Sequence, residues 1–500
     1  MRRTFLALAL TALGFAIPAT SQTQSDLRPR VHFSPQQNWT NDPNGLVYFD
    51  GEYHLFYQYA PESMTPAHIS WGHAVSTDLL HWKELGVAIP AKGDEAIFTG
   101  SVVVDEHNTS GLCEGDKPCL VAIYTGNYGS GKTQHEVQEI AVSQDRGRTF
   151  TPYRGNPILD LHMSDYRDPG VLWNDETKLW TMVVALPDMH QVYFYTSPDL
   201  KAWTKVSSFG PTAAIGGQWE CPNLLKISNH SGASLWALKI GINPGGLQGG
   251  SGEQYFLGSF DGKQFTQSTE PGSHGWSDYG KDSYCALAFN HMPAGKQPTL
   301  LGWMDNWQYA ERQPTFPWRG QMTVPRSLTL LHDKVGIAMA EEPAVAPLRM
   351  GKAMPVRLSV DTSTLLTRTP TELDLKFAPA DAKVFGVRLY SDESHWTEIG
   401  FDLKRLKMWM DRTHAGMQIT SDFPTKTEAP ISPDRSFDLR LVLDRISVEA
   451  FAQSGTVAMT NLVFPLTETL TVKAFADTRS ALVTGEGWHL QSTLATTASH

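Results

Sequence analysis

The sequence predicts an all-β protein, with a five-bladed β-propeller followed by a C-terminal β-sandwich. Three observations support this prediction. Short apolar and aromatic segments recur from about residue 28 to 340, a turn motif repeats between them, and the spacing of the strands changes after a proline-containing connection. Long helical periodicity is absent from the first region. The chain has 500 residues, which is enough for two or three domains.

Residues 1–21 have the features of a cleavable signal peptide. Arg2 and Arg3 give a positively charged start, residues 6–16 form an apolar run, and Ala19 and Ser21 give an A-x-S cleavage pattern. The run is too short to cross a bilayer, and no other segment reaches the ~18 apolar residues that a span needs. A buried N-terminal helix is the alternative. We expect an exported protein, secreted or periplasmic, without a transmembrane segment.

The propeller prediction, for residues 28–340, rests on a repeated turn. The pattern Ser-x-Asp, then a turn and an aromatic residue, begins at residues 76, 143, 197 and 259. The aspartate can accept hydrogen bonds from the backbone of its own turn, and the aromatic residue begins the next strand. A period of about 50 to 65 residues is typical of propeller blades. A strand cluster near residues 284–303 supplies the fifth blade. The alternative is a large sandwich in which these turns recur by chance.

The second domain is predicted from a change in pattern. Residues 341–355 begin with EEPAVAP, which is typical of a linker. Residues 356–492 contain short alternating segments, among them 384–390, 437–443 and 447–451. These fit a separate β-sandwich.

The four cysteines predict one local disulfide. Cys113 and Cys119 flank a polar turn, EGDKP, and in an exported chain a disulfide is favoured there over a metal site. Cys221 and Cys285 lie in apolar segments, and we interpret them as separate buried thiols. No cluster of cysteine and histidine has the spacing of a zinc site, so no metal is expected.

The charge of the chain argues against nucleic acid as a partner. Lys and Arg total 41 and Asp and Glu total 52, so the formal net charge is −11. No basic block stands out in the sequence. The sequence does not reveal the oligomeric state.

Three segments share a different pattern, an acid followed by proline and an apolar strand. The acids are Asp42, Asp168 and Glu220. In a propeller the innermost strand of each blade lines the central channel, so acids at equivalent positions meet there. Carboxylates gathered in one cavity raise each other's pKa and are costly to bury, which implies a function. The alternatives are simple turn residues, or a calcium site, although the dense oxygen-ligand loop usual for calcium is absent.

Cleavage of a glycosidic bond needs such carboxylates. One attacks or assists water, and a second, protonated, donates to the leaving oxygen. Glutamate suits the proton donor, because its stem is longer and its pKa starts higher, which assigns Glu220 to this role. Asp42 on a rigid turn suits the nucleophile. The third carboxylate, Asp168, can hold sugar hydroxyls, and the neighbouring Arg167 can keep it ionised.

At these residues the chain resembles glycoside hydrolase family 32, the β-fructosidases. Residues 39–45 (WTNDPNG) are similar to its W-x-N-D-P-N-G motif, residues 166–169 (YRDP) to its R-D-P motif and residues 219–222 (WECP) to its E-C motif. The resemblance implies that Asp42 is the nucleophile, Asp168 the transition-state stabiliser and Glu220 the acid/base. Residues 444–451 resemble a signature of the family's sandwich domain. Thr40 and Ala450 depart from the common residues, and neither replaces an acid.

Other motifs of this resemblance imply substrate-binding residues. Propeller cores are rich in aromatic residues, so Trp71 and Trp307 are also interpretable as core. The residues implied are Asn41, Gln58, Trp71, Phe98, Ser101, Arg167 and Trp307.

The resemblance implies a retaining exo-β-fructosidase that hydrolyses terminal non-reducing β-D-fructofuranosyl residues of fructans (levan or inulin) and sucrose. Residues 241–256 and 314–320 look most like secreted inulinases and levanases of exo type. The chemistry requires no cofactor. A fructosyltransferase on the same fold and a non-catalytic fructan-binding protein are the alternatives. The preference between β-2,1 and β-2,6 linkages is not readable from these motifs.

Overall fold

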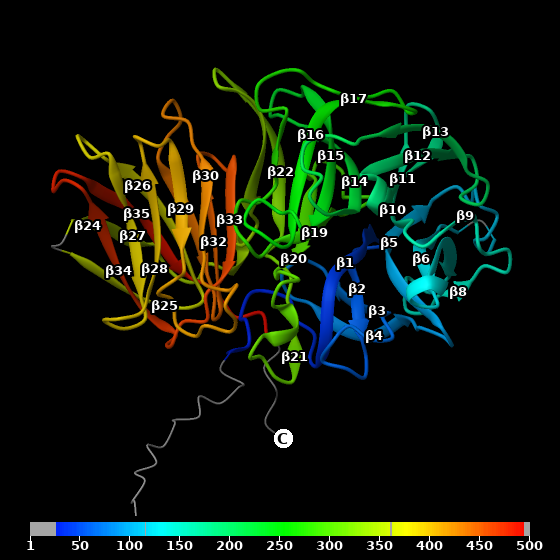
Figure 1. Ribbon diagram of the computed structural model, residues 1–500, viewed down its shortest axis with the longest axis horizontal. Coiled ribbons are helices and arrows are strands. Elements are labelled where there is room, and N and C mark those ends of the chain that lie inside the picture. Colours follow the sequence, from blue (N-terminus) through cyan, green and yellow to red (C-terminus); the bar gives the residue numbers. More distant parts are fainter. Residues whose placement is uncertain (1–26, 116, 361–362, 495–500) are drawn as a thin grey trace, which may run out of the picture.

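The computed structural model describes residues 27–115, 117–360 and 363–494, and strands dominate it (Figure 1). Two domains lie side by side in Figure 1, with the propeller in blue to green and the sandwich in yellow to red. The all-β prediction is therefore confirmed. The predicted signal peptide, 1–21, lies outside the described residues. Within the described part of the chain, no helix is long and apolar enough to cross a membrane.

Five sheets form the first domain, one for each predicted blade. Blade 1 contains β1 (Asn38–Phe49), β2 (Glu52–Ala60), β3 (Ser70–Ser76) and β4 (Lys83–Ile89), with β21 (Trp318–Arg319) beside β1. Blade 2 contains β5 (Glu95–Asp105), β6 (Cys119–Tyr128), β7 (His135–Ser143), β8 (Thr151–Pro152) and β9 (Leu159–Met163). Blade 3 contains β10 (Arg167–Asn174), β11 (Leu179–Leu186), β12 (Gln191–Ser197) and β13 (Thr204–Phe209).

The last two blades complete the ring. Blade 4 contains β14 (Gln218–Ser228), β15 (Ser234–Asn243), β16 (Gly252–Phe260), β17 (Phe265–Gln267) and β18 (His274–Trp276). Blade 5 contains β19 (Tyr284–Ala288), β20 (Thr299–Trp303), β22 (Arg326–Asp333) and β23 (Gly336–Pro343). The inner strands contact one another in the cyclic order β1, β5, β10, β14, β19 and back to β1. They therefore surround a central channel, as the five-bladed prediction requires.

The Ser-x-Asp turns connect the third and fourth strands of blades 1 to 4. Asp78 Oδ1 accepts hydrogen bonds from the backbone N–H groups of Leu80 and His81, at 2.9 and 2.8 Å. Asp199 and Asp261 accept equivalent pairs of backbone bonds in blades 3 and 4. These bonds are local, so the sequence pattern alone was sufficient to predict the turns.

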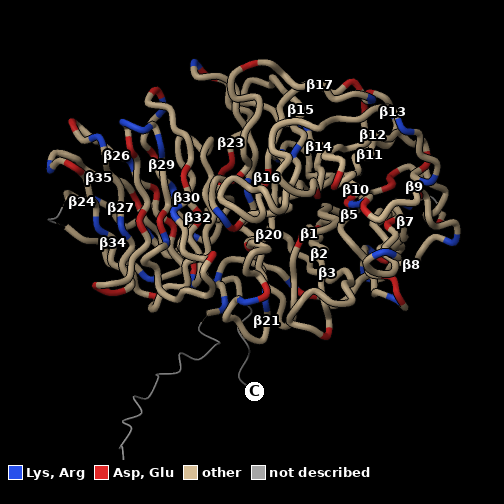
Figure 2. The backbone as a smooth tube through the Cα atoms, in the orientation of Figure 1, with Lys and Arg blue, Asp and Glu red and all other residues tan. Residues whose placement is uncertain are grey.

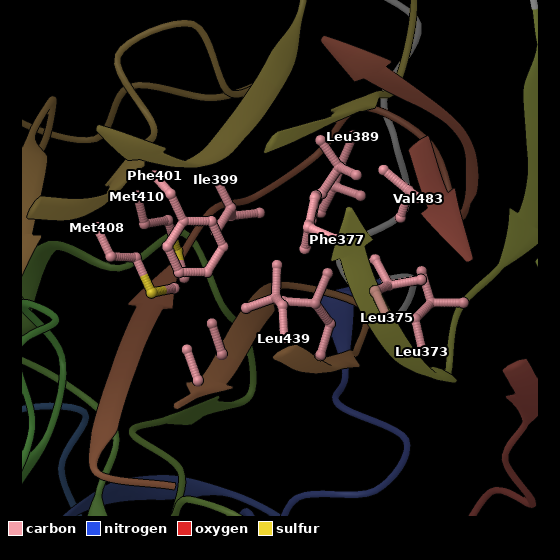
Figure 3. Close-up of a cluster of buried hydrophobic side chains, with 14 of the residues drawn as sticks. Leu373, Leu375, Phe377, Leu389, Ile399, Phe401, Met408, Met410, Leu439 and Val483 are labelled. Carbon is pink, nitrogen blue, oxygen red and sulfur yellow. The ribbon is translucent and has the colours of Figure 1, made fainter. Parts of the chain in front are cut away.

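Two six-stranded sheets form the second domain. The first has the order β24 (Met354–Ser359), β35 (Leu482–His489), β26 (Thr371–Ala378), β31 (Asp438–Leu443), β32 (Ser447–Ala452) and β33 (Val457–Leu462). The second has the order β25 (Thr364–Arg368), β34 (Thr469–Ala476), β27 (Val384–Tyr390), β28 (Trp396–Asp402), β29 (Lys407–Asp411) and β30 (Lys426–Pro430). Inward side chains of both sheets, among them Leu375, Phe401 and Leu439, pack into one apolar core (Figure 3). Because β23 extends to Pro343 and β24 begins at Met354, the connection between the domains is shorter than the predicted linker.

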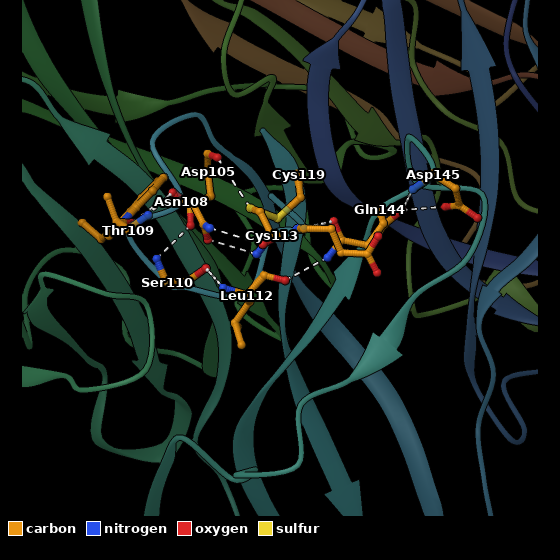
Figure 4. The surroundings of a disulfide bond; sticks show 12 residues. Asp105, Asn108, Thr109, Ser110, Leu112, Cys113, Cys119, Gln144 and Asp145 are labelled. Atoms are coloured by element: carbon orange, nitrogen blue, oxygen red, sulfur yellow. Dashed lines mark hydrogen bonds between the residues drawn. A yellow bond between two sulfur atoms is a disulfide. The ribbon is translucent and has the colours of Figure 1, made fainter. Parts of the chain in front are cut away.

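The local disulfide predicted between Cys113 and Cys119 is present in the loop before β6 (Figure 4). Hydrogen bonds between Asn108 and the backbone of Cys113 hold the same loop. Lys and Arg are interspersed with Asp and Glu over both domains in the view of Figure 2. That distribution agrees with the absence of a basic block in the sequence.

A buried network of charges joins the two domains. Arg326 of β22 pairs with Glu341 of β23, at 2.9 Å, and with Glu449 of the sandwich strand β32, at 2.6 Å. Between Asp444 and Glu449 lies His32, whose two ring nitrogens are 2.7 and 2.8 Å from their carboxylates. Burial alone would lower the pKa of His32, but the hydrogen bonds to Asp444 and Glu449 outweigh it and raise this pKa to about 9.

This raised pKa predicts a stability that depends on pH. A group with a raised folded-state pKa stabilises fully below its unfolded value, which is 6.5 for His32, and the contribution is lost as pH rises through about 9. We expect the free energy of unfolding in urea to fall by on the order of 3 kcal/mol between pH 6.5 and 9.5 from this group. The variant His32→Gln should lose that slope, whereas His81→Gln, at an exposed histidine, should keep it. An equal slope in all three proteins would contradict the assignment.

Candidate active site

The five inner strands share an irregularity near their first residues. The pairing register shifts at Thr40/Pro43 in β1, and at the corresponding places at the starts of β5, β10, β14 and β19. Such bulges bend a strand and turn a side chain out of the regular alternation. Asp42, Asp168 and Glu220 lie within or beside three of these irregularities. The local backbone thus directs each acid into the mouth of the channel.

The mouth of the channel is a cavity of about 400 Å³. Eight of the ten predicted site residues line it, namely Asn41, Asp42, Gln58, Phe98, Arg167, Asp168, Glu220 and Trp307. The space immediately beneath, lined by Ser101, Asp168 and Cys221 among others, holds only about 20 Å³. The cavity is therefore a pocket that narrows sharply below the acids.

Asp42 lies at the floor of this pocket and is 9% exposed. Thr99 of β5 donates its hydroxyl to Asp42 Oδ2 at 3.0 Å, whereas Oδ1 is buried without a hydrogen-bond partner among the described residues. Burial, together with the negative charge of Glu220, raises the pKa of Asp42 to about 7. One oxygen is thus held and the other is left unpartnered.

Asp168, the second residue of β10, adopts a left-handed backbone conformation, with φ of 65°. Its N–H donates to the hydroxyl of Thr125 at 3.0 Å, and its Oδ2 accepts a hydrogen bond from the backbone N–H of Cys221 at 2.8 Å. Burial raises the pKa of Asp168 despite the neighbouring Arg167 guanidinium. The side chain is therefore fixed between blades 2, 3 and 4.

Glu220 is the most accessible of the three acids, with 19% of its side chain exposed. Its Oε1 accepts hydrogen bonds from Nε and Nη2 of Arg167 at 3.2 and 3.0 Å. Its Oε2 accepts a hydrogen bond from the hydroxyl of Tyr284. Burial, with the nearby negative charge of Glu220 adding to it, raises the pKa of Tyr284, so the phenol remains a donor.

Arg167 connects the acids to the rim of the pocket. Its Nη1 lies 3.2 Å from Glu136 Oε1 and 3.0 Å from Asp165 Oδ1, and its Nη2 donates to Gln218 at 2.8 Å. Burial would lower its pKa, but the surrounding carboxylates, Glu220 first, raise it instead. The guanidinium therefore stays charged and orients Glu220.

Two predicted residues do not reach the pocket. Trp71 is fully buried, and its indole N–H donates to the carbonyl of Phe98 at 2.9 Å, so it supports the pocket wall from behind. The hydroxyl of Ser101 donates to the carbonyl of Pro169 at 2.7 Å, below the acids. Trp307, by contrast, lines the pocket and packs against Trp39 and Trp303.

Both domains match one family of enzymes. Residues 32–343 match the glycosyl hydrolases family 32 N-terminal domain, and residues 343–489 match the family 32 C-terminal domain. The chain belongs to glycoside hydrolase family 32. The resemblance seen in the motifs is thereby confirmed, and the protein is a glycoside hydrolase.

Individual relatives in family 32 cover most of the chain. A levanase of Bacillus subtilis (strain 168) is 38% identical over 91% of this chain and 69% of its own length. An extracellular exo-inulinase of Aspergillus awamori is 38% identical over 88% of this chain and 89% of its own length. The crystal structure of exo-inulinase from Aspergillus awamori superposes with a TM-score of 0.88 at 36% identity, covering 94% of this chain and 99% of that one. A β-fructofuranosidase from Schwanniomyces occidentalis, complexed with fructosyl-erythritol, gives a TM-score of 0.83 at 31% identity over 92% and 97% of the chains.

The prediction for the remaining cysteines is wrong, because Cys221 and Cys285 form a disulfide. They lie 64 residues apart, at the starts of the neighbouring inner strands β14 and β19. Only the packing of blade 5 against blade 4 brings these strands together, so no local pattern revealed the pair. The disulfide lies directly under the family 32 acids, where Cys221 supplies the N–H that binds Asp168. Because both sulfurs are bonded, they are not available as metal ligands beside Asp42.

Sequence reasoning missed three residues around the acids of this family 32 site: Thr99, Glu136 and Tyr284. Tyr284 starts β19, the inner strand of blade 5, and a search of every inner-strand start would have found it. Thr99 is the fifth residue of β5 and lies within the register shift between Ile97 and Gly100, so only the bulge marks its position. Glu136 is on β7, which is not an inner strand, and it is fully buried below Arg167. The acid-proline pattern of the inner strands therefore could not predict Glu136.

Proposed function

We propose that this family 32 enzyme is an exo-β-fructosidase that releases terminal non-reducing β-D-fructofuranosyl units from fructans and sucrose, with retention. The observation that carries the proposal is the gathering of three carboxylates, those of Asp42, Glu220 and Asp168, around one pocket. Relatives named levanase, exo-inulinase and invertase support the substrate class.

In the proposed reaction the Asp42 carboxylate attacks the anomeric carbon of the terminal fructosyl unit. Glu220, when protonated, donates its proton to the departing glycosidic oxygen, and a covalent fructosyl ester on Asp42 forms. Glu220 then takes a proton from water, which attacks the anomeric carbon and frees Asp42. Asp168 accepts hydrogen bonds from ring hydroxyls, and these bonds strengthen as positive charge develops on the ring.

The shape of the pocket favours action at chain ends. Below the acids only about 20 Å³ is free, roughly the room for one water molecule, so a second sugar cannot extend past them. A fructan would therefore enter with its terminal residue first.

The site needs no cofactor for this chemistry. We also propose that the protein is exported, which agrees with the extracellular exo-inulinase among its relatives.

The products released from inulin, levan and sucrose test this function. We expect free fructose as the first product of all three substrates, measured by chromatography from the earliest time points. Oligosaccharides released first from inulin or levan would contradict exo action. Predominant formation of larger oligosaccharides at high sucrose would show a fructosyltransferase, and binding without any release of fructose would show a non-catalytic protein.

A further inference from the structure

Two histidines and one aspartate meet at the outer edge of blade 2, beside the active-site pocket and outside it. His135 Nε2 lies 2.9 Å from Asp160 Oδ1, and His162 Nδ1 lies 3.1 Å from Asp160 Oδ2. The three side chains offer ligand atoms that all lie within 4.8 Å of one another. The Asp160 carboxylate is 21% exposed and the His162 ring 84% exposed, so the group is open to solvent on one side.

The fold brings this group together from separate strands. His135 begins β7, whereas Asp160 and His162 lie on β9, which pairs with β7 in an irregular register between Glu136/Met163 and Gln138/Leu159. His162 adopts a left-handed conformation, with φ of 55°, and its N–H donates to Asp160 Oδ1 at 2.6 Å. The bend turns the His162 ring back towards Asp160.

We propose that His135, Asp160 and His162 bind one divalent late transition-metal ion of the Zn²⁺ class. Tetrahedral Zn²⁺ binds imidazole nitrogen and carboxylate oxygen at about 2.0 to 2.2 Å, which places neighbouring ligand atoms about 3.3 Å apart. The two nitrogen–oxygen distances, 2.9 and 3.1 Å, need only small side-chain movements to reach this spacing. Water can occupy the remaining position on the exposed side.

The ligand set selects against other common cations. Mg²⁺ and Ca²⁺ prefer six or more oxygen ligands, and two imidazoles with one carboxylate do not supply them. Elsewhere, Asp78 with His81 and Asp392 with His395 form exposed pairs of one carboxylate and one imidazole. These pairs provide matched controls, because each has the same local chemistry without the second histidine in its ion pair.

A bound ion would link β9, through Asp160 and His162, to β7, through His135, next to the pocket. His135 lies between Gln134 and Glu136, both of which line the pocket, and the chain after β9 leads directly to Asp165 and Arg167. We therefore expect the metal to stabilise the fold around this rim. It takes no part in the fructosyl transfer, since its ligands lie outside the pocket.

Calorimetric titration of Zn²⁺ into tag-free, EDTA-treated protein tests the site. We expect one strong site per chain, a lower affinity by about tenfold or more in His162→Ala and in Asp160→Asn, and an unchanged affinity in His395→Ala. Saturating Zn²⁺ should raise the melting temperature of the wild-type protein and of His395→Ala but not of His162→Ala. Co²⁺ should give visible absorption bands that the His162→Ala variant lacks.

Equal Zn²⁺ affinity in wild type and His162→Ala would overturn the assignment, as would the absence of both binding heat and stabilisation at millimolar Zn²⁺. Stronger binding of Mg²⁺ than of Zn²⁺ would overturn the proposed metal class. His162 is exposed, so its replacement should leave the far-ultraviolet circular dichroism spectrum of the metal-free protein unchanged, and a loss of affinity then reports on the ligand. None of these readouts depends on fructosidase activity.

Discussion

Replacing Asp42 by alanine should reduce the turnover of sucrose by about 10³-fold or more, because the variant cannot form the covalent fructosyl ester. The loss corresponds to about 4 kcal/mol or more of transition-state stabilisation. The KM for sucrose should change far less than kcat.

The matched control for Asp42→Ala is Asp165→Asn. Asp165 lines the same pocket and binds the same Arg167 at 3.0 Å, but it does not contact Asp42. We expect the Asp165→Asn variant to keep most of its kcat. A turnover of Asp42→Ala within tenfold of the wild type would remove the nucleophile from the proposed mechanism, and an equal loss in both variants would indicate a general effect of charge in the pocket.

Replacing Glu220 by alanine should reduce sucrose turnover by about 10² to 10⁴-fold, because neither step then has its proton donor or acceptor. A substrate whose leaving group needs no proton separates the two steps. With β-D-fructofuranosyl fluoride, the Glu220→Ala variant should still release fluoride in a burst equal to the enzyme concentration. Azide, a nucleophile that needs no base, should then accelerate turnover and give the fructosyl azide of retained configuration.

This pattern distinguishes the two carboxylates from each other. Asp42→Ala should show neither the fluoride burst nor the retained azide product. The control Gln218→Ala also removes a partner of Arg167, at 2.8 Å, but leaves the proton donor in place, and it should behave nearly as wild type. If Glu220→Ala gave no burst with the fluoride, its role would lie in binding or orientation instead of proton transfer.

The sequence alone was sufficient to predict those features of the protein that depend on short motifs. The acids at 42, 168 and 220 each lie within the first five residues of a strand. The turns at Asp78, Asp199 and Asp261 are held by bonds from residues two and three positions further on. Local hydrogen bonds and strand starts leave a pattern that can be read along one segment. Trp71 is an exception: its motif predicted a substrate-binding residue, but the folded chain buries this side chain completely.

By itself, the sequence determined the two β-domains, the three acids and the enzyme family, because strand alternation, turn chemistry and acid motifs are properties of short segments. Only the tertiary structure decided which residues surround those acids. The Cys221–Cys285 disulfide, the bond from Tyr284 to Glu220, the ion pair of Glu136 with Arg167 and the cluster at His135 all join different strands. Such contacts depend on how neighbouring blades pack and on the register of their strands, and neither leaves a periodic signal in the chain.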